Sequence, residues 1–228
     1  MGTMSAESIA LIERGFSIGF ADTPAELGEA QRLRYLVYLQ EHGYEPGLGG
    51  IDADEHDSHA RHVVLRLASG EMVGTARLVT ALPGQPRNSF PMQSVCDASV
   101  FDGLPVARTG EISRFLLSRD LRRLGGRADA MLRLGLMKGL LQASHEIGLT
   151  HWCAVMEHSL LRLLRQASIH FEAVGPAIEC HGVRQPARGS IEAILERGNY
   201  ERPAIWDYVT DGGRYYASTR RAPAAIAA

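Results

Sequence analysis

Charged residues interrupt two short runs that otherwise have the composition of β-strands. Arg77 lies within residues 74–79, and Glu111 and Arg114 lie within residues 111–115. Charges are rare in central strands unless they are paired or functional, and a carboxylate held there could act as a general base. An edge strand with hydrated charges is the alternative. Strand alternation places Glu111 and Arg114 on opposite faces unless a β-bulge between them redirects one side chain.

A second candidate site is the basic, glycine-containing turn at residues 119–126, which leads directly into a helical pattern. Backbone N–H groups at a helix N-terminus are unpaired and carry the positive end of the helix dipole. Glycine would let a phosphate approach these groups closely, and flanking arginines would add charge. We therefore predict a phosphate-binding turn, although an ordinary glycine turn with hydrated arginines would give the same pattern. Its candidate residues are Arg119, Arg122, Arg123, Gly125, Gly126 and Arg127.

The acidic segment 52–59 contains carboxylates and histidines, which are residue types that ligate metal ions. An EF-hand loop that began at Asp52 would need glycine at its sixth position and glutamate at its twelfth, but Asp57 and Val63 stand there. The histidines also lack the spacing of a zinc site. We therefore predict a hydrated loop and no metal ion.

Helices and strands must position these residues. Thr23 is a helix N-cap with Glu26 three residues after it, and apolar residues at helical spacing predict a helix over 24–41 that ends at His42-Gly43. Residues 1–20 are weakly patterned and are expected at the periphery, and residues 81–108 are expected to form an irregular loop that could cover a substrate. The remaining predicted elements are strands at 62–67, 72–80, 111–118, 150–156, 169–174 and 177–183, and helices at 127–147, 158–167 and 190–197.

The order of these elements joins an antiparallel hairpin to a βαβα segment. It predicts an α/β or α+β fold in which helices cover both faces of a sheet. The length of 228 residues favours one domain over 1–228, with a core at about 25–185 and a peripheral segment at each end.

Composition excludes several functional classes. The 24 Lys+Arg nearly balance the 26 Asp+Glu, which argues against a globally basic nucleic-acid binder. No apolar run approaches the ~20 residues of a membrane span, and the N-terminus lacks a secretory signal. The three cysteines are odd in number and widely spaced, which indicates reduced thiols and a cytoplasmic protein. Motifs of dinucleotide enzymes, P-loop enzymes, α/β-hydrolases and zincins are missing.

The charged residues follow one another in a familiar order. Arg34-x-x-x-Tyr38 is followed by Tyr44, by Asp54-x-x-Asp57, and then by residues 74–78 and 111–115. Over about residues 25–185 this order resembles the autoinducer-synthase-like branch of the GNAT fold. That branch contains acyl-homoserine-lactone synthases, N-acyl amino acid synthases and the acyltransferases of PEP-CTERM/exosortase systems.

Departures from the lactone synthases favour the other two groups. Those synthases usually carry Phe and Trp where this chain has Tyr38 and Tyr44, and they tend to have a Pro-Thr pair where Val79-Thr80-Ala81 stands here. Residues 148–186 look more like the exosortase-associated acyltransferases and the N-acyl amino acid synthases. His181 is the one histidine singled out, because it lies in a His-Gly-x-Arg segment.

The resemblance implies a GNAT-like, mostly antiparallel central sheet with helices on both faces. It also implies fatty acyl transfer from an acyl-carrier protein or acyl-CoA to the amine of an amino-acid-like acceptor, without a permanently bound cofactor. Acyl transfer needs a base for the amine and donors for the carbonyl oxygen, so the expected catalytic residues are Glu111, Arg114 and Ser113. The expected acceptor-binding and charge-network residues are Arg34, Tyr38, Tyr44, Asp54, Asp57 and Arg77.

Electrostatics supports one network among these side chains. Three cations, Arg34, Arg77 and Arg114, can neutralise three anions, which we expect to be Asp54, Asp57 and Glu111. The reaction needs no covalent intermediate, so no cysteine is expected to be a nucleophile. Two alternatives stay open: a lactone synthase that uses S-adenosylmethionine, and a non-catalytic acyl-binding module. An acyl-carrier protein is the expected partner, and no nucleic acid is expected.

Overall fold

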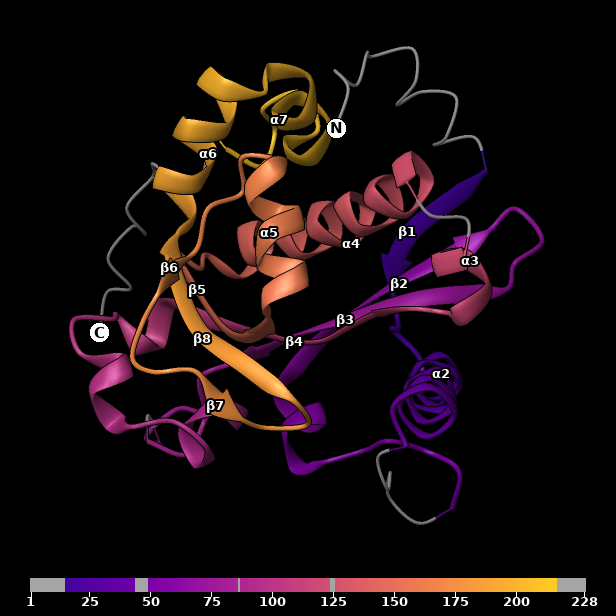
Figure 1. Ribbon diagram of the computed structural model, residues 1–228, viewed down its shortest axis with the longest axis horizontal. Helices are drawn as coiled ribbons and strands as arrows, with labels where there is room; N and C mark the ends of the chain where they lie inside the picture. The colour runs from indigo at the N-terminus through magenta and orange to yellow at the C-terminus, as the bar shows by residue number, and fades with distance from the viewer. Residues whose placement is uncertain (1–14, 44–48, 86, 124–125, 217–228) are drawn as a thin grey trace, which may run out of the picture.

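A single mixed sheet organises the part of the chain that the computed structural model describes, residues 15–43, 49–85, 87–123 and 126–216 (Figure 1). Its strand order is β1-β2-β3-β4-β5-β8-β6, with β7 also paired to β8. All neighbouring strands run antiparallel except β4 and β5, which are parallel. The strands are β1 (Phe16–Phe20), β2 (Ala60–Leu67), β3 (Met72–Thr80), β4 (Thr109–Leu117), β5 (His151–Glu157), β6 (Glu172–Ala173), β7 (Ile178–Glu179) and β8 (Val183–Ser190).

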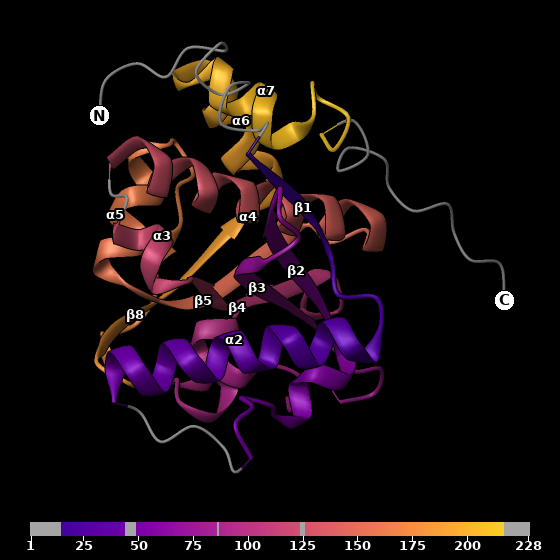
Figure 2. The ribbon, with the colours of Figure 1, turned by 90° about the vertical axis from the view of Figure 1, so that its right-hand side faces the viewer.

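Helices cover both faces of this sheet, which confirms the predicted fold class. Figure 2 shows α2 along one face and α4 along the other, with α6 and α7 forming an outer layer over α4. The irregular segment between β3 and β4 lies on the α2 side and contains short 3-10 turns. The helices are α2 (Pro24–His42), α3 (Arg119–Arg123), α4 (Gly126–Ile147), α5 (His158–Gln166), α6 (Ile191–Glu201) and α7 (Pro203–Thr210).

Local sequence explains the boundaries of α2. The Thr23 hydroxyl accepts a hydrogen bond from the Glu26 N–H, and the Glu26 carboxylate accepts from the Thr23 N–H, so a capping box begins the helix as predicted. Gly43 ends it with φ of 63°, a left-handed conformation that glycine adopts without steric cost. Ala30 faces the sheet and contributes to a small core cluster with Val64 and Met72.

The main core lies on the opposite face, between the sheet and α4. Leu134, Leu136 and Leu140 are fully buried there, as the apolar stripe of the 127–147 helix predicts. A separate cluster includes Val79 of β3, Cys153 of β5 and Phe90 of the irregular segment, so residues 81–108 are packed onto the sheet. None of the helices within the described ranges is long and apolar enough to cross a membrane.

Several elements differ from the expectations. Residues 16–20, for which no strand was predicted, form β1, an edge strand paired with β2. The predicted strands at 169–174 and 177–183 shrink to the two-residue β6 and β7, whereas the long strand is β8 at 183–190. A further helix, α7, follows α6, and the expected turn at 119–126 begins as the short helix α3.

Candidate active site

A β-bulge in β4 brings the predicted catalytic side chains to one face of the sheet. Residues 75–77 of β3 lie opposite residues 113–116 of β4, so β4 carries one extra residue at this point. Arg114 lies in the bulge with φ of 51°, a left-handed conformation that costs a non-glycine residue roughly 1–2 kcal/mol. Simple alternation would place the side chains of Glu111 and Arg114 on opposite faces of the sheet. The observed bulge is the alternative stated from the sequence, and it redirects one of them.

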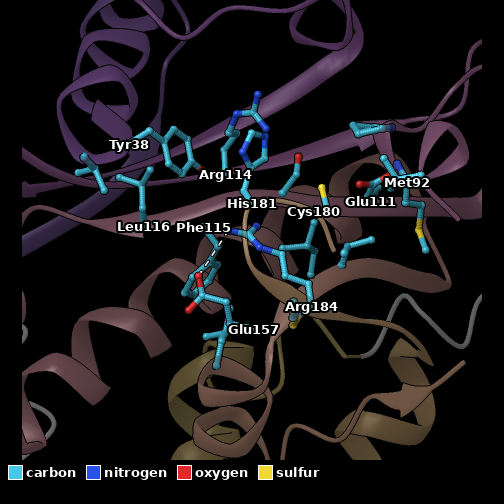
Figure 3. A pocket seen from close by; sticks show the side chains of 18 of the residues that line it. Tyr38, Met92, Glu111, Arg114, Phe115, Leu116, Glu157, Cys180, His181 and Arg184 are labelled. Carbon is cyan, nitrogen blue, oxygen red and sulfur yellow. Dashed lines mark hydrogen bonds and ion pairs between the residues drawn. The ribbon is translucent and has the colours of Figure 1, made fainter. Parts of the chain in front are cut away.

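Where the bulge begins, β4 also separates from β5. The parallel pairing runs from Thr109 opposite His151 to Ile112 opposite Ala154, and after that β5 pairs only with β8. The separation contributes to a cavity of about 540 Å³ that reaches from α2 to α5 (Figure 3). Backbone amides of β4 after Ile112 are therefore no longer paired with β5, and residues 113–117 line the cavity.

Three arginines and three aspartates form an ion-pair network beside this cavity. Arg34 donates to Asp57 at 3.0 Å, and Arg77 donates to Asp57 at 2.7 Å and also to Asp54. Arg114 donates two hydrogen bonds to the Asp52 carboxylate, from Nε at 2.6 Å and from Nη2 at 3.1 Å. The network has three charges of each sign, as predicted, but its third anion is Asp52.

Glu111 is therefore absent from the network, and the prediction that it would neutralise an arginine is wrong. Asp52 reaches Arg114 from the loop before η1 (Glu55–His59), and it is the third anion of the network in place of Glu111. Arg114 contacts Asp54 as well, at 3.1 Å, and its guanidinium lies 5.6 Å from the ring centroid of Tyr38. This contact is a cation–π interaction that ties β4 to α2.

The network holds its charges in a largely buried environment. The side chains of Arg34 and Arg77 are fully buried. Burial alone would raise the pKa of Asp57, but Arg34 and Arg77 together hold that pKa well below its usual range. The pKa of Asp54 is likewise lowered, because Arg77 and Arg114 outweigh the effect of burial. Both aspartates are thus ionised at neutral pH.

His62 completes the surroundings of Arg34 as a neutral side chain. Burial and the charge of Arg34 lower the pKa of His62 to about 4. Arg34 Nη2 lies 2.6 Å from His62 Nδ1, and since a guanidinium only donates, Nδ1 must accept. The proton therefore lies on Nε2, which can donate to the Asp57 carbonyl oxygen at 3.3 Å.

Glu111 is buried among less polar groups. Its carboxyl is 3% exposed, and Oε2 accepts a hydrogen bond from the Met92 N–H at 2.9 Å. Burial raises the pKa of Glu111 to about 8, against the opposing effects of that hydrogen bond and of the charges of Arg77 and Arg114. A carboxyl near this value can take up and release a proton close to neutral pH, which suits a general base. Ser113 lies two residues along the strand, and its hydroxyl oxygen accepts from Arg77 Nε at 3.0 Å.

The cysteines near Glu111 lack thiolate character. Burial raises the pKa of Cys96 to about 11, and burial raises the pKa of Cys153 well above its ordinary value. The negative charge of Glu111 contributes to both shifts. Thiols in this state are poor nucleophiles. No group of three or more His, Cys, Asp or Glu side chains within the described ranges is placed to hold a metal ion.

The predicted phosphate-binding turn is described in part. Gly126 begins α4 with φ of 58°, and a Cβ at that position would meet no described atom within 4 Å. Arg119 is exposed at the start of α3. Asp129 and Arg133, one and two turns into α4, line the cavity. The side chains of Arg122, Arg123 and Arg127, and the residues Gly125 and Tyr44, lie outside what the structure describes.

Comparison with known proteins identifies this arrangement. Residues 33–132, which run from α2 into α4, match the model of the acetyltransferase (GNAT) domain. The chain contains a GNAT domain. The bulge of β4, its separation from β5 and the N-terminus of α4 all lie in or directly beside this part of the GNAT domain. Comparison with curated proteins gave no match.

Solved structures share the fold of this GNAT domain. TofI in a complex with an inhibitor and MTA is 18% identical, with a TM-score of 0.61, over 84% of this chain and 96% of TofI. The CoA-dependent acyl-homoserine lactone synthase BjaI, with SAM and isopentyl-CoA, is 22% identical, with a TM-score of 0.58, over 89% of each chain. FeeM, an N-acyl amino acid synthase from uncultured soil microbes, is 14% identical, with a TM-score of 0.61, over 80% of this chain and 93% of FeeM. The resemblance of this chain to the autoinducer-synthase-like branch is therefore confirmed at the level of fold.

The structure adds site residues that the sequence did not single out. In the sequence Asp52 is only one carboxylate of an acidic segment, and His62 stands at the start of an ordinary strand pattern. Met92 contributes a backbone N–H, which carries no sequence signal. Arg184 lines the cavity from β8 and belongs to the His-Gly-x-Arg segment, which is the one hint the sequence offered.

Proposed function

We propose that this chain is an N-acyltransferase that moves a fatty acyl group from a thioester to the amine of an amino-acid-like acceptor. The observation that carries the proposal is the position of Glu111, a buried carboxyl with a pKa near 8, in the wall of a cavity that opens where β4 leaves β5. The donor thioester would enter from the α4 side and the acceptor from the α2 side. The buried charge network would hold the acceptor wall in place.

The chemistry requires one proton acceptor and one set of donors. The acceptor amine attacks the thioester carbonyl carbon, a C–N bond forms, and the C–S bond then breaks. Glu111 takes the amine proton, directly or through a water, and the thiolate leaves and is protonated. Backbone N–H groups of β4 beyond Ile112 would stabilise the developing oxyanion, because these amides are no longer paired with β5.

The walls of the cavity favour an acyl chain longer than acetyl. Its volume of about 540 Å³ and the apolar side chains on the α5 side, from Leu160 and Leu163, give room for hydrocarbon. Phe115 and Leu116 add apolar surface from β4. The donor head would lie at the N-terminus of α4, where Gly126 leaves space for a phosphate of a phosphopantetheine arm.

We also propose that one cytoplasmic domain carries the activity and that an acyl-carrier protein is the partner. Arg119 is exposed beside the proposed donor entrance, and the basic residues of the 119–127 segment would suit an acidic carrier surface. Acyl-CoA is the competing donor. Comparing the kcat/KM of matched acyl-carrier-protein and acyl-CoA thioesters would separate the two.

Thiol release tests the proposed activity. The purified protein is incubated with thioesters of graded chain length and with amino acids, and free thiol and N-acyl product are measured together. We expect the two to appear in equal amounts and to depend on Glu111, so that Glu111→Gln loses turnover. The proposal fails if no thioester of any chain length is consumed.

The structural similarity to TofI and BjaI suggests one other acceptor to test. TofI was solved with MTA and BjaI with SAM, so S-adenosylmethionine is the acceptor to test beside amino acids. Release of methylthioadenosine together with thiol would assign the chain to lactone synthesis. Thiol release with amino acids alone would favour N-acyl amino acid synthesis.

A further inference from the structure

Arg184 is a cavity-lining cation whose hydrogen-bonding capacity is only partly used. It lies in β8, where its Cα is opposite Glu157 of β5 on one side and Ile178 of β7 on the other. Among the described residues its polar contact is between Nη2 and Glu157 Oε1, at a long 3.4 Å (Figure 3). Its Nε is buried and has no hydrogen-bond partner among the described residues. A buried guanidinium donor without a partner is costly, and a ligand oxygen would relieve that cost.

The surroundings of Arg184 hold it firmly. A tight hairpin joins β7 to β8, with His181 at φ of 51° and Gly182 at φ of 88°, and Cys180 N–H donates to the Gly182 carbonyl at 3.1 Å. Arg184 is the second residue of β8 after this turn, and both neighbouring strands pair with it. His181 and Cys180 line the same cavity from the hairpin (Figure 3). The guanidinium thus projects from a rigid element.

The other cavity-lining arginines are already neutralised by short contacts. Arg114 is held by Asp52 and Asp54, and Arg133 is held by Asp129 at 2.9 Å. Glu157, the partner of Arg184, is 49% exposed, and ion pairs of this exposure contribute little, about 0–1 kcal/mol. Arg184 is therefore the cavity cation that can most readily accept a new anion.

Arg184 also lies within electrostatic range of the acceptor wall. Burial raises the pKa of the Tyr38 hydroxyl, and the charges of Arg114 and Arg184 both act against that rise. Tyr38 belongs to α2 and Arg184 belongs to β8, so their side chains line one cavity from different elements. An acceptor bound between them would have its amine near the base only if its other end were anchored.

We infer that Arg184 is the specificity-determining residue that binds the α-carboxylate of the acceptor. This inference rests on the proposed function and assigns the acceptor to amines that carry a free carboxylate, as amino acids do. Nε and one Nη of a guanidinium match the two oxygens of a carboxylate, and such bidentate pairs are strong and directional. Glu157 would release Arg184 when the acceptor binds and would otherwise keep its side chain oriented.

Paired acceptors test this role. Each proteinogenic amino acid and its carboxamide are compared as acceptors for wild type, Arg184→Met, Arg184→Lys and Glu157→Gln. We expect Arg184→Met to raise the KM for amino acids about 10- to 100-fold, to leave the KM for carboxamides and for the thioester unchanged, and to change kcat little. Arg184→Lys should recover part of the loss, because it keeps the charge without the fork. Glu157→Gln should leave the KM for amino acids equal or lower.

Calorimetry with the same amino acids and carboxamides gives a readout that does not need turnover. Wild-type protein should bind the acid more tightly than the amide, and Arg184→Met should lose that preference while its thermal unfolding stays cooperative. An unchanged acid-to-amide ratio in Arg184→Met, or a wild type that binds both equally, would overturn the inference. Absence of thiol release with every thioester would instead count against the proposed function, and binding would still decide the role of Arg184.

Discussion

Glu111→Gln is expected to make the enzyme less active and the fold more stable. The carboxyl has a pKa of about 8 in the folded chain, against an ordinary value of 4.5. At pH 7 only about one tenth of the molecules carry the ionised base, since each pH unit changes the ratio tenfold. The kcat/KM of wild type should therefore rise about tenfold between pH 7 and a plateau above pH 8. Gln should remove this inflection and lower kcat/KM by about 10²–10⁴.

The stability change follows from the same pKa. A carboxyl whose pKa is raised by folding holds more protons when folded, so its burial destabilises the fold as pH rises from 4.5 towards 8. The unfolded chain ionises this carboxyl with a pKa of about 4.5, which is about 2.5 units below pH 7. Keeping the carboxyl protonated in the folded chain at pH 7 therefore costs at most about 3 kcal/mol, at 1.36 kcal/mol per pH unit. Gln keeps an oxygen for the Met92 N–H and has no charge to bury. Glu111→Gln should therefore gain up to this amount at pH 7 and nothing at pH 4.

Two assays decide the matter. Urea unfolding of both proteins at pH 4, 7 and 8 measures the stability difference, and the pH dependence of kcat/KM measures the base. Because the acceptor amine also titrates, the profile is recorded with an amino acid and with its amide, whose amine has a lower pKa. An inflection that moves with the amine, or a Gln variant that keeps the wild-type profile, would refute Glu111 as the base. Equal stability at pH 7 would refute the account of its burial.

Three further outcomes are expected. Asp57→Asn should cost about 3–5 kcal/mol in urea unfolding at pH 7, because it leaves two fully buried arginines short of a partner, whereas Asp22→Asn on an exposed ion pair should cost less than 1 kcal/mol. The Asp57 contribution should be lost progressively in wild type as pH falls from about 4 towards the lowered pKa of that carboxyl, since ionic pairing lowers this pKa on folding. Gly126→Ala should cost about 1–2 kcal/mol from its positive φ and raise the KM of the thioester more than that of the amine, which initial-rate kinetics would reveal. Cys153→Ala should keep kcat within about threefold and show no acyl-enzyme by mass spectrometry, and a trapped acyl adduct on wild-type Cys153 would contradict direct transfer.

Local signals predicted the elements that their own residues specify. The capping box at Thr23 and the glycine at 43 set the ends of α2, and apolar stripes located α4 and the β2–β3 hairpin. β8 was misplaced because it contains Pro186, Gly189 and several polar residues, which have low strand propensity. Its pairing with β5 on one side and with β6 and β7 on the other overrides that local preference.

The site was predictable in its members and less so in its pairing. Charges within strand-like runs located Arg77, Glu111 and Arg114, because such charges need a reason to be there. Which carboxylate meets which arginine depends on how the loop before η1 lies across the sheet, and the sequence carries no measure of that path. Asp52 is therefore the third anion of the network, where Glu111 was expected, and Glu111 accepts from the Met92 N–H instead.

The parallel pairing of β4 with β5, the only one among the described strands, determines which parts of the sequence form each half of the proposed site. A parallel neighbour requires a crossover, and α4 provides it, so the base, the bulge and the helix terminus follow one another within residues 109–133. The acceptor wall of the proposed function would instead come from α2, the 52–57 loop and the β7–β8 hairpin, which lie before and after that stretch. Under the proposed function, the residues that handle the donor are thus contiguous in the sequence, and the residues that would select the acceptor flank them on both sides. Exchanging the residues of the β7–β8 hairpin between relatives should change which amine is accepted and leave the binding of the thioester unchanged.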